Sequence, residues 1–548
     1  MGLRTPMQST PGSKARMPAS AKSQTAKHAL PSWPSVEQAE DLTEAFFHNV
    51  HAQFPFLHRP TLKKWEQECR RSRSPGGVTE LGDVPVFFVL MVYATGSLVS
   101  KHIDTAAAEK YYIAAMEYLG PVLEQDGMES IQALLAIAVY SVRSPLGVSL
   151  WKVSGMALRL CVQLGYHRSV EKYRRSGDAI TKEMSKRCFW AAYTFDRYVS
   201  SILGLPGGIS DLAIDVELPF DINDEELTSA GIVLAADRTS PTTMTGAIHT
   251  IKLRQIWSKF STHLFPTSSL CSHDNHGDSG PTIEELRQEL EDWRATAPVV
   301  VDPPLDSPLS VFASIGWFQL AYNHSILLLY RHYIMDTKPY KCSPPLPKTP
   351  DIVNRAFEEC FAKAQDQCLL YRRMYQNPSI QFTWGSLHML FFSGLTYLYC
   401  LWRSKPIRDA AKQRDVVNTC MACQTVLVII AERWKLATSY RDLFETLSDR
   451  TISMMCGDLV PETTLPRSSS PEADTVEQER VLPSQDWTNN FDGLDIPPES
   501  EWMVSELFQT AQGLDPTEWD DITNIDVDFS FQPDAFHHPA MWNNAGVL

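Results

Sequence analysis

The sequence has no excess of positive charge, since 49 lysines and arginines stand against 65 aspartates and glutamates. This balance excludes a protein that is basic overall and binds nucleic acid across its whole surface, although it does not exclude a small basic module. Glycine and proline, at 26 and 36 of 548 residues, are too few for a fibrous or wholly disordered chain. The length leaves room for two or three domains and a large core.

Cysteine is absent before Cys69, and no apolar signal region opens the chain. The eleven cysteines are odd in number and scattered, which predicts reduced thiols in an intracellular protein. Two groups have spacing that resembles a metal site: Cys420 with Cys423, and Cys271 with His273 and His276. Neither group has enough further ligands nearby, so we interpret them as core cysteines and a solvated loop. We therefore expect no cofactor and no metal in this chain.

Alternation of apolar and polar residues typical of strands is scarce, whereas apolar residues recur every three to four positions. This period predicts an all-α fold, a large multi-helix bundle-like body over 36–465. Helices are expected at 36–51, 84–101, 104–125, 129–142, 148–165, 179–203, 246–264, 282–296, 309–335, 349–376, 380–402, 407–437 and 439–456. Two uncharged stretches, 307–330 and 374–402, are long enough to cross a membrane. The asparagine, glutamine and histidine residues within them favour interior helices of a soluble protein.

Charge is distributed unevenly between the two ends of the chain. Residues 1–32 contain five basic residues and no acidic one, so 1–35 is predicted to be a disordered, basic, Ser/Pro-rich arm. From Ser468 to Leu548 there are seventeen acidic residues and one basic residue, Arg480. The segment 466–548 is therefore predicted to be a disordered acidic tail. Its charge asymmetry is typical of interaction segments.

Bulky apolar residues interrupt the acids of this tail, a composition typical of disordered activation domains. We expect a short helix near 500–511 to fold on a coactivator, whereas a purely solubilising tail would be poor in aromatics. The candidate contact residues are Trp502, Leu507, Phe508, Trp519, Phe529 and Phe531.

The segment 151–219 is the most distinctive part of the body. Trp151, Gly155, Leu158 and Val162 fall on one helical face, where Gly155 is predicted to admit a close helix. Gly165 is predicted to cap this helix in the left-handed conformation, and Gly204 with Pro206 to end the next one. Asp196 lies in an apolar row and needs a cation, for which Arg159 or Arg168 is the candidate. The acids between Asp211 and Glu226 are interpreted as a solvated loop and helix start.

Taken together, these residues resemble the fungal-specific transcription factor domain, the middle homology region of fungal zinc binuclear cluster regulators. The resemblance covers about 40–265, including an opening segment, Phe46–His51 and Phe54–Leu62. Leu205 departs from it, because the family has Arg in this Gly-x-Pro turn. The residues that carry the resemblance, and that we take as its structural signature, are Trp151, Gly155, Arg159, Gly165, His167, Arg168, Trp190, Asp196, Arg197, Gly204 and Pro206.

Regulators of this family bind DNA through an N-terminal cluster of six cysteines that holds two zinc ions, and zinc would be expected here only with such a cluster. The given sequence shows no such cluster, and three explanations for this stay open: a gene model that starts late, a protein that acts through a DNA-binding partner, or a degenerate relative. The resemblance implies a nuclear transcription regulator without catalysis, an activator of metabolic or biosynthetic genes. Its expected partners are coactivators and DNA, directly or through another protein, with a homodimer as one candidate assembly and no membrane.

The alternatives are a coregulator without its own DNA-binding module and an all-α enzyme. A helical cyclase would need aspartate-rich metal motifs inside its bundle. The nearest approach is Asp520-Asp521, in the predicted tail, where no cavity would exclude water. No Ser/His/Asp or Cys/His set with a recognisable local context occurs in the sequence.

Overall fold

A computed structural model describes residues 33–73, 82–100, 102–173, 177–233, 242–264, 281–298, 314–334, 349–375, 383–435 and 437–456. Apart from residues 33–35, the predicted arm (1–35) and tail (466–548) lie outside these ranges. The group Cys271, His273 and His276 also lies outside them. Within the described ranges the fold is all-α, as the hydrophobic period predicts.

The first half of the body is built from short and medium helices around one long one, α9. Ser35 begins α1 with a capping box, and Asp178 caps α9 by accepting the Thr181 N–H. In chain order these elements are α1 (Val36–Phe46), the π-helix η1 (Phe47–His51), α2 (Arg59–Arg73), α3 (Asp83–Val99), α4 (Thr105–Met116), α5 (Leu119–Leu123), α6 (Met128–Ser141), α7 (Leu150–Gln163), α8 (Val170–Tyr173) and α9 (Ala179–Leu203).

A segment with little regular structure follows α9, and eight helices complete the body. The segment holds two 3₁₀ turns, η2 (Asp211–Ala213) and η3 (Asp224–Glu226), and an antiparallel pair, β1 (Leu227–Thr228) and β2 (Gly231–Ile232), with Leu227 opposite Ile232. The later helices are α10 (Thr245–Leu264), α11 (Ile283–Ala295), α12 (Ile315–Ile334), α13 (Pro350–Tyr375), α14 (Trp384–Arg403), α15 (Lys405–Ala410), α16 (Gln413–Arg433) and α17 (Ala437–Cys456).

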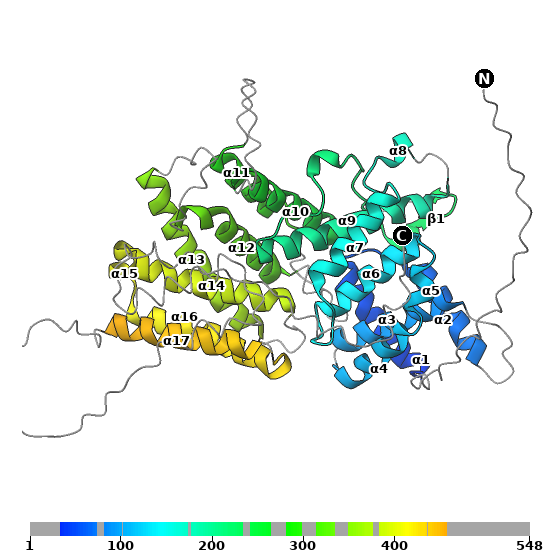
Figure 1. The fold of residues 1–548 in the computed structure, drawn as a ribbon, viewed down its shortest axis with the longest axis horizontal. Helices are drawn as coiled ribbons and strands as arrows, with labels where there is room; N and C mark the ends of the chain where they lie inside the picture. Colours follow the sequence, from blue (N-terminus) through cyan, green and yellow to red (C-terminus); the bar gives the residue numbers. More distant parts are fainter. Residues whose placement is uncertain are drawn as a thin grey trace, which may run out of the picture.

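The helices of the body form two groups that lie side by side (Figure 1), and each group has a hydrophobic core. The N-terminal core gathers buried residues from α1 to α9, drawn from blue to cyan, and the C-terminal core gathers those from α10 to α17, drawn from green to orange. Tyr198 of α9 and Trp384 of α14 pack against both cores. The long helix α9 therefore contributes to the boundary between the two halves, where it contacts α10 and α14.

Most of the predicted helices are present, but two were not foreseen, α2 and α8. The buried face of α2 includes a carboxylate, Glu66, beside Leu62 and Cys69, which masks its helical period in the sequence. The Glu66 carboxylate is satisfied because Tyr93 Oη donates to it at 2.6 Å and Arg70 at 3.2 Å. Two predicted helices, 104–125 and 407–437, are each divided into two.

The two uncharged stretches largely form α12 and α14, both in the interior of the C-terminal half, as predicted. Within the described ranges, a different helix, α16, is the one that is long and apolar enough to cross a membrane by length and composition alone. Its apolar side packs against α13, α14 and α17. Core helices of soluble proteins meet the same test, so α16 carries no membrane assignment.

Candidate functional site

The signature residues Asp196 and Arg197 form a buried ion pair at the C-terminal end of α9. Arg197 Nη1 donates to Asp196 Oδ2 at 2.6 Å, and the two side chains are 5% and 4% exposed. The same guanidinium donates to Asp211 at 2.9 Å and to Ser258 Oγ of α10 at 3.0 Å, and it lies 4.5 Å from the ring centre of Tyr193. A buried carboxylate partnered by a cation is thus confirmed. The predicted partners Arg159 and Arg168 are wrong, because the adjacent Arg197 turns back onto Asp196.

This ion pair holds the glycine-rich turn that follows α9. Gly204 ends α9, as predicted, and has the left-handed conformation with φ 66°. The Gly208 N–H donates to Asp196 Oδ2 at 3.0 Å. A Cβ on Gly207 would lie 2.3 Å from Arg197 Nη1, and a Cβ on Gly208 would lie 2.9 Å from Asp196 Oδ1. Burial raises the pKa of Asp196, and the Gly208 N–H and Arg197 oppose that rise. Positions 207 and 208 therefore need glycine, because the backbone of the turn packs directly against the ion pair.

The second group of signature residues joins the turn after α7 to the Asp215–Glu217 segment. Arg168 Nε donates to Asp215 Oδ1 at 2.8 Å, and the Ser169 N–H donates to the same oxygen at 2.9 Å. These hydrogen bonds hold the pKa of Asp215 below its usual value. The indole N–H of Trp190 donates to the Glu217 carbonyl at 2.9 Å. Gly165 has φ 71°, as predicted for the left-handed cap before this turn.

Backbone contacts tighten the same junction, since the N–H groups of Asp215 and Val216 both donate to the His167 carbonyl at 3.2 Å. Asp215 and Glu217, interpreted from the sequence as part of a solvated loop, are partly exposed but have fixed partners. The solvated-loop interpretation is wrong for Asp224 and Glu226, which are buried. Glu217 accepts the Val170 N–H at 3.1 Å and the Ser169 hydroxyl.

A third network, absent from the sequence-based candidates, surrounds Asp224. Arg187 of α9 is fully buried and donates from Nη1 to Asp224 Oδ1 at 2.5 Å. The Arg59 N–H donates to Asp224 Oδ2 at 2.8 Å, and His51 Nε2 lies 3.6 Å from Oδ1. Although burial opposes it, the nearby His51 and Arg187 hold the pKa of Asp224 well below its usual value. The network therefore links the opening segment to α9. In the sequence, the feature that could have indicated it is the pair of adjacent basic residues Lys186-Arg187.

Of the predicted packing face of α7, Leu158 is buried, whereas Trp151, Gly155 and Val162 lie outside the buried face. Trp151 is 43% exposed and Val162 is 38% exposed, and a Cβ added at Gly155 would meet no atom within 4 Å. Arg159 is also exposed. The buried face is formed by Leu150, Val153, Ser154, Ala157, Leu158 and Cys161, so it shares only Leu158 with the predicted one. The prediction that Gly155 admits a neighbouring helix is therefore wrong.

Replacing Gly155 by alanine is expected to raise the free energy of unfolding by about 0.5–1 kcal/mol, because alanine is the better helix former and no neighbour obstructs its methyl group. The matched control is Gly96→Ala in α3, where a Cβ would lie 2.3 Å from the Leu42 carbonyl oxygen of α1. This change should lower stability by about 1–3 kcal/mol. Urea denaturation of both variants gives the measurement, and a destabilised Gly155→Ala chain would contradict the exposed face.

Eight cysteines, spread over both halves, are buried and carry no disulfide. Burial raises the pKa of the Cys420 thiol to about 12, which disfavours the thiolate needed for metal binding or nucleophilic attack. Cys423 is also buried, so the interpretation of the Cys420–Cys423 spacing as core cysteines is confirmed. Among the residues whose placement is described, no cluster of three or more His, Cys, Asp or Glu side chains could hold a metal ion.

The fold and these networks define an all-helical domain. Its charged residues, among them several of the signature residues, pair with one another and so fix the turns and the opening segment of the domain. Residues 43–295 match the family described as the Fungal specific transcription factor domain. The match includes the Asp196, Asp215 and Asp224 networks and extends beyond the end of the resemblance seen in the sequence. This match confirms the resemblance to that domain found in the sequence.

Curated relatives agree with this assignment. The chain is 24% identical over 516 residues to the Positive regulator of purine utilization of Emericella nidulans, covering 77% of this chain and 47% of the relative. It is 28% identical over 360 residues to the Pyrimidine pathway regulatory protein 1 of Saccharomyces cerevisiae, covering 63% and 37%. It is 26% identical over 428 residues to the Activator of stress genes 1 of the same yeast, covering 73% and 42%.

The chain thus spans about half the length of these relatives or less. No solved structure matches the chain.

Proposed function

We propose that this chain is a nuclear regulator of transcription, an activator of metabolic or biosynthetic genes. The observation that carries the proposal is the match of residues 43–295 to the Fungal specific transcription factor domain. The names of the relatives, which refer to purine utilization, a pyrimidine pathway and stress genes, support a role in regulating genes. Contact with DNA, direct or through a partner protein, belongs to the same proposal, as do a homodimer and coactivator partners.

Within this proposal the helical body is the regulatory domain and has no catalytic role. What supports this is the use of its buried carboxylates: Asp196 faces Arg197 at 2.6 Å, and Asp224 faces Arg187 at 2.5 Å. Carboxylates held in this way are occupied by cations and are poorly placed to act as general acids or bases on a substrate. The signature residues are proposed to maintain the shape of the domain.

The acidic segment 466–548 is proposed to be the activation segment. Because apolar anchors carry most of the energy of such interfaces, alanine at Trp502, Leu507, Phe508, Trp519, Phe529 and Phe531 should lower activation about tenfold or more. The full chain is fused to a heterologous DNA-binding module and a reporter gene is measured, with protein levels compared by immunoblotting.

The matched control replaces six polar residues of the same segment by alanine: Gln485, Thr488, Asn489, Gln509, Thr510 and Thr523. This variant should activate as well as the unmodified fusion. Equal activation by both variants would show that the apolar residues make no contact with a coactivator and that the segment serves only solubility.

A further inference from the structure

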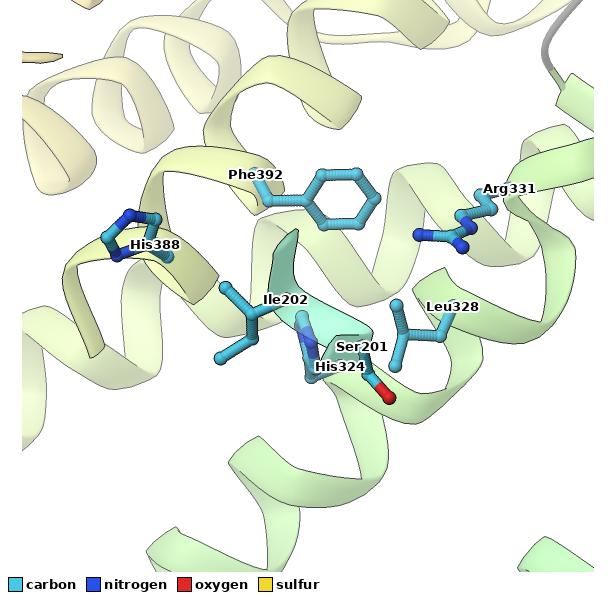
Figure 2. Close-up of a pocket in the computed structure, with 7 residues that line it drawn as sticks. All are labelled: Ser201, Ile202, His324, Leu328, Arg331, His388 and Phe392. Atoms are coloured by element: carbon cyan, nitrogen blue, oxygen red, sulfur yellow. The ribbon is translucent and has the colours of Figure 1, made fainter. Parts of the chain in front are cut away.

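The interior between the two halves of the body leaves little room for a ligand. Figure 2 shows a pocket there, lined by Ile202 of α9, His324 of α12 and Phe392 of α14 together with other side chains. The space inside it admits about one water molecule, which is too little for an organic ligand. The surface of the body is therefore the better place for a binding function.

The helix α16 has an exposed side that carries no charge along most of its length. In Figure 1, α16 and α17 lie side by side at one edge of the C-terminal half, and the buried side of α16 packs against α13, α14 and α17. From 416 to 431, sixteen consecutive residues include no Asp, Glu, Lys or Arg. The solvent side of a surface helix normally carries charges, whereas the centre of a protein interface is depleted of them. The exposed side of α16 thus has the composition of an interface.

Six exposed residues form one row along this side of α16. They follow one another at spacings of 4, 3, 4, 3 and 4 residues, the heptad spacing of helices that pack as a coiled coil. The members of the row are Arg414, Asn418, Met421, Thr425, Val428 and Glu432. Met421 is 56% exposed and Val428 is 38% exposed. The row therefore has an uncharged middle, with a cation at one end and an anion at the other.

The spacing of this row is the same when it is followed in either direction. Two copies of α16 packed antiparallel about a two-fold axis near position 423 would therefore bring each member of the row opposite another member. Arg414 of each copy would face Glu432 of the other, so the ion pair would occur twice, as in any two-fold dimer. Parallel packing would instead place like charges opposite each other at both ends. The charges of the row are thus complementary to those of a second, antiparallel copy.

The exposed side of α7 differs in this respect. Beside its apolar residues Trp151 and Met156 it carries two exposed cations, Lys152 and Arg159, and α7 contains no acidic residue. Two copies packed through α7 would bring only positive charges together. Self-complementarity is therefore a property of the α16 row and not of exposed apolar helix faces in general.

We propose that the α16 row is the surface through which two copies of this chain associate, with the two α16 helices antiparallel. The inference rests on the homodimer included in the proposed function and assigns a surface to it. With 21 residues, α16 is about 30 Å long, and one helix face of that length offers less than the area of about 800 Å² per partner found in stable interfaces. The dimer is therefore expected to be weak, with a Kd of about 10–100 μM.

Sedimentation equilibrium of the purified full chain, up to about 200 μM in about 0.15 M salt, tests this proposal. The unmodified chain should pass from monomer to dimer as its concentration rises. Arg414→Glu and Glu432→Arg should each raise the Kd about tenfold, because either change turns both attractive end pairs into repulsive ones. The double variant restores opposite charges at both ends and should associate about as well as the unmodified chain.

A double variant that associates no better than the single variants would overturn the antiparallel pairing. A chain that stays monomeric throughout would overturn the second copy as the occupant of this face and would indicate a different protein there. Assembly beyond the dimer would contradict a closed two-fold contact.

The middle of the row is tested by Met421→Lys. A lysine here would have to give up water at the centre of the interface, so the Kd should rise about tenfold or more. The matched control is Ile113→Lys on α4, where the replaced side chain is 58% exposed and lies in the other half of the body. It should leave the Kd unchanged, and equal effects of the two changes would contradict the interface. Sedimentation needs neither DNA nor a reporter gene, so failure here leaves the role in transcription to the activation assay.

Discussion

A chain in which Asp224 is replaced by asparagine is expected to have a free energy of unfolding about 3–5 kcal/mol lower than the unmodified chain. The cause is the fully buried guanidinium of Arg187, which loses the carboxylate that accepts from it at 2.5 Å. It keeps Glu183 at 3.3 Å, but that carboxylate is shared with Lys186, so the result should fall toward the lower end of the range. Asparagine keeps the shape, but when its oxygen accepts the Arg59 N–H its NH2 group faces the Arg187 donor, so the change removes the charge and one hydrogen bond. Urea denaturation at pH 7 measures the difference.

Glu225→Gln is the matched control, because it removes a carboxylate from the neighbouring, exposed position. Its effect should stay within about 0.5 kcal/mol. A difference of less than about 1 kcal/mol between Asp224→Asn and Glu225→Gln would show that the buried pair contributes no more than a surface carboxylate.

The pH dependence gives a second check on the same residue. The pKa of Asp224 is held well below its usual value in the folded chain, whereas in the unfolded chain it returns to about 3.9. The stabilisation by its charge is therefore complete above about pH 5 and is lost as the pH falls further. The difference between the unmodified and Asp224→Asn chains should accordingly narrow below about pH 4. A difference that grows on acidification would contradict this assignment.

Alanine at Asp196 is the second change with a large expected effect, a loss of about 3–5 kcal/mol. It leaves the buried Arg197 without the carboxylate at 2.6 Å and removes the acceptor of the Gly208 N–H. Asp211 still accepts from Arg197 at 2.9 Å, so the result should fall toward the lower end of that range. The melting temperature of the purified chain gives the measurement.

Asp211→Ala serves as the control for this prediction. Its carboxylate binds the same guanidinium, but its side chain is 40% exposed, so water replaces it at small cost and the loss should be at most about 1 kcal/mol. If Asp196→Ala left the melting temperature unchanged, the ion pair would not be what holds the turn. If Asp211→Ala were the more damaging change, the exposed carboxylate would be the important partner.

Local features of this domain could be predicted from its sequence. The helical period determined the all-α class, and the left-handed cap at Gly165 and the helix end at Gly204 follow from their place after apolar helical runs. The need of Asp196 for a cation also followed, because a carboxylate in an apolar row cannot remain alone. That Arg197 is the partner of Asp196 could not be predicted, because sequence spacing does not show how a long side chain folds back along its own helix.

Features that depend on distant segments could not be predicted in the same way. Asp224 looked like one of several solvated acids, because the cation and the N–H group that surround it come from α9 and α2. The face of α7 was predicted wrongly because Trp151 and Gly155 suggest a packed surface, while the position of α9 and α6 decides which side is covered.

By itself, the sequence determined the helical class, the family signature and the extreme charge of the two ends, because these depend on composition, period and short-range spacing. The tertiary structure alone decided which carboxylate meets which guanidinium and which face of α7 is covered. The physical reason is that burial and pairing arise where helices far apart in the chain come together, and only there does water leave the charged groups.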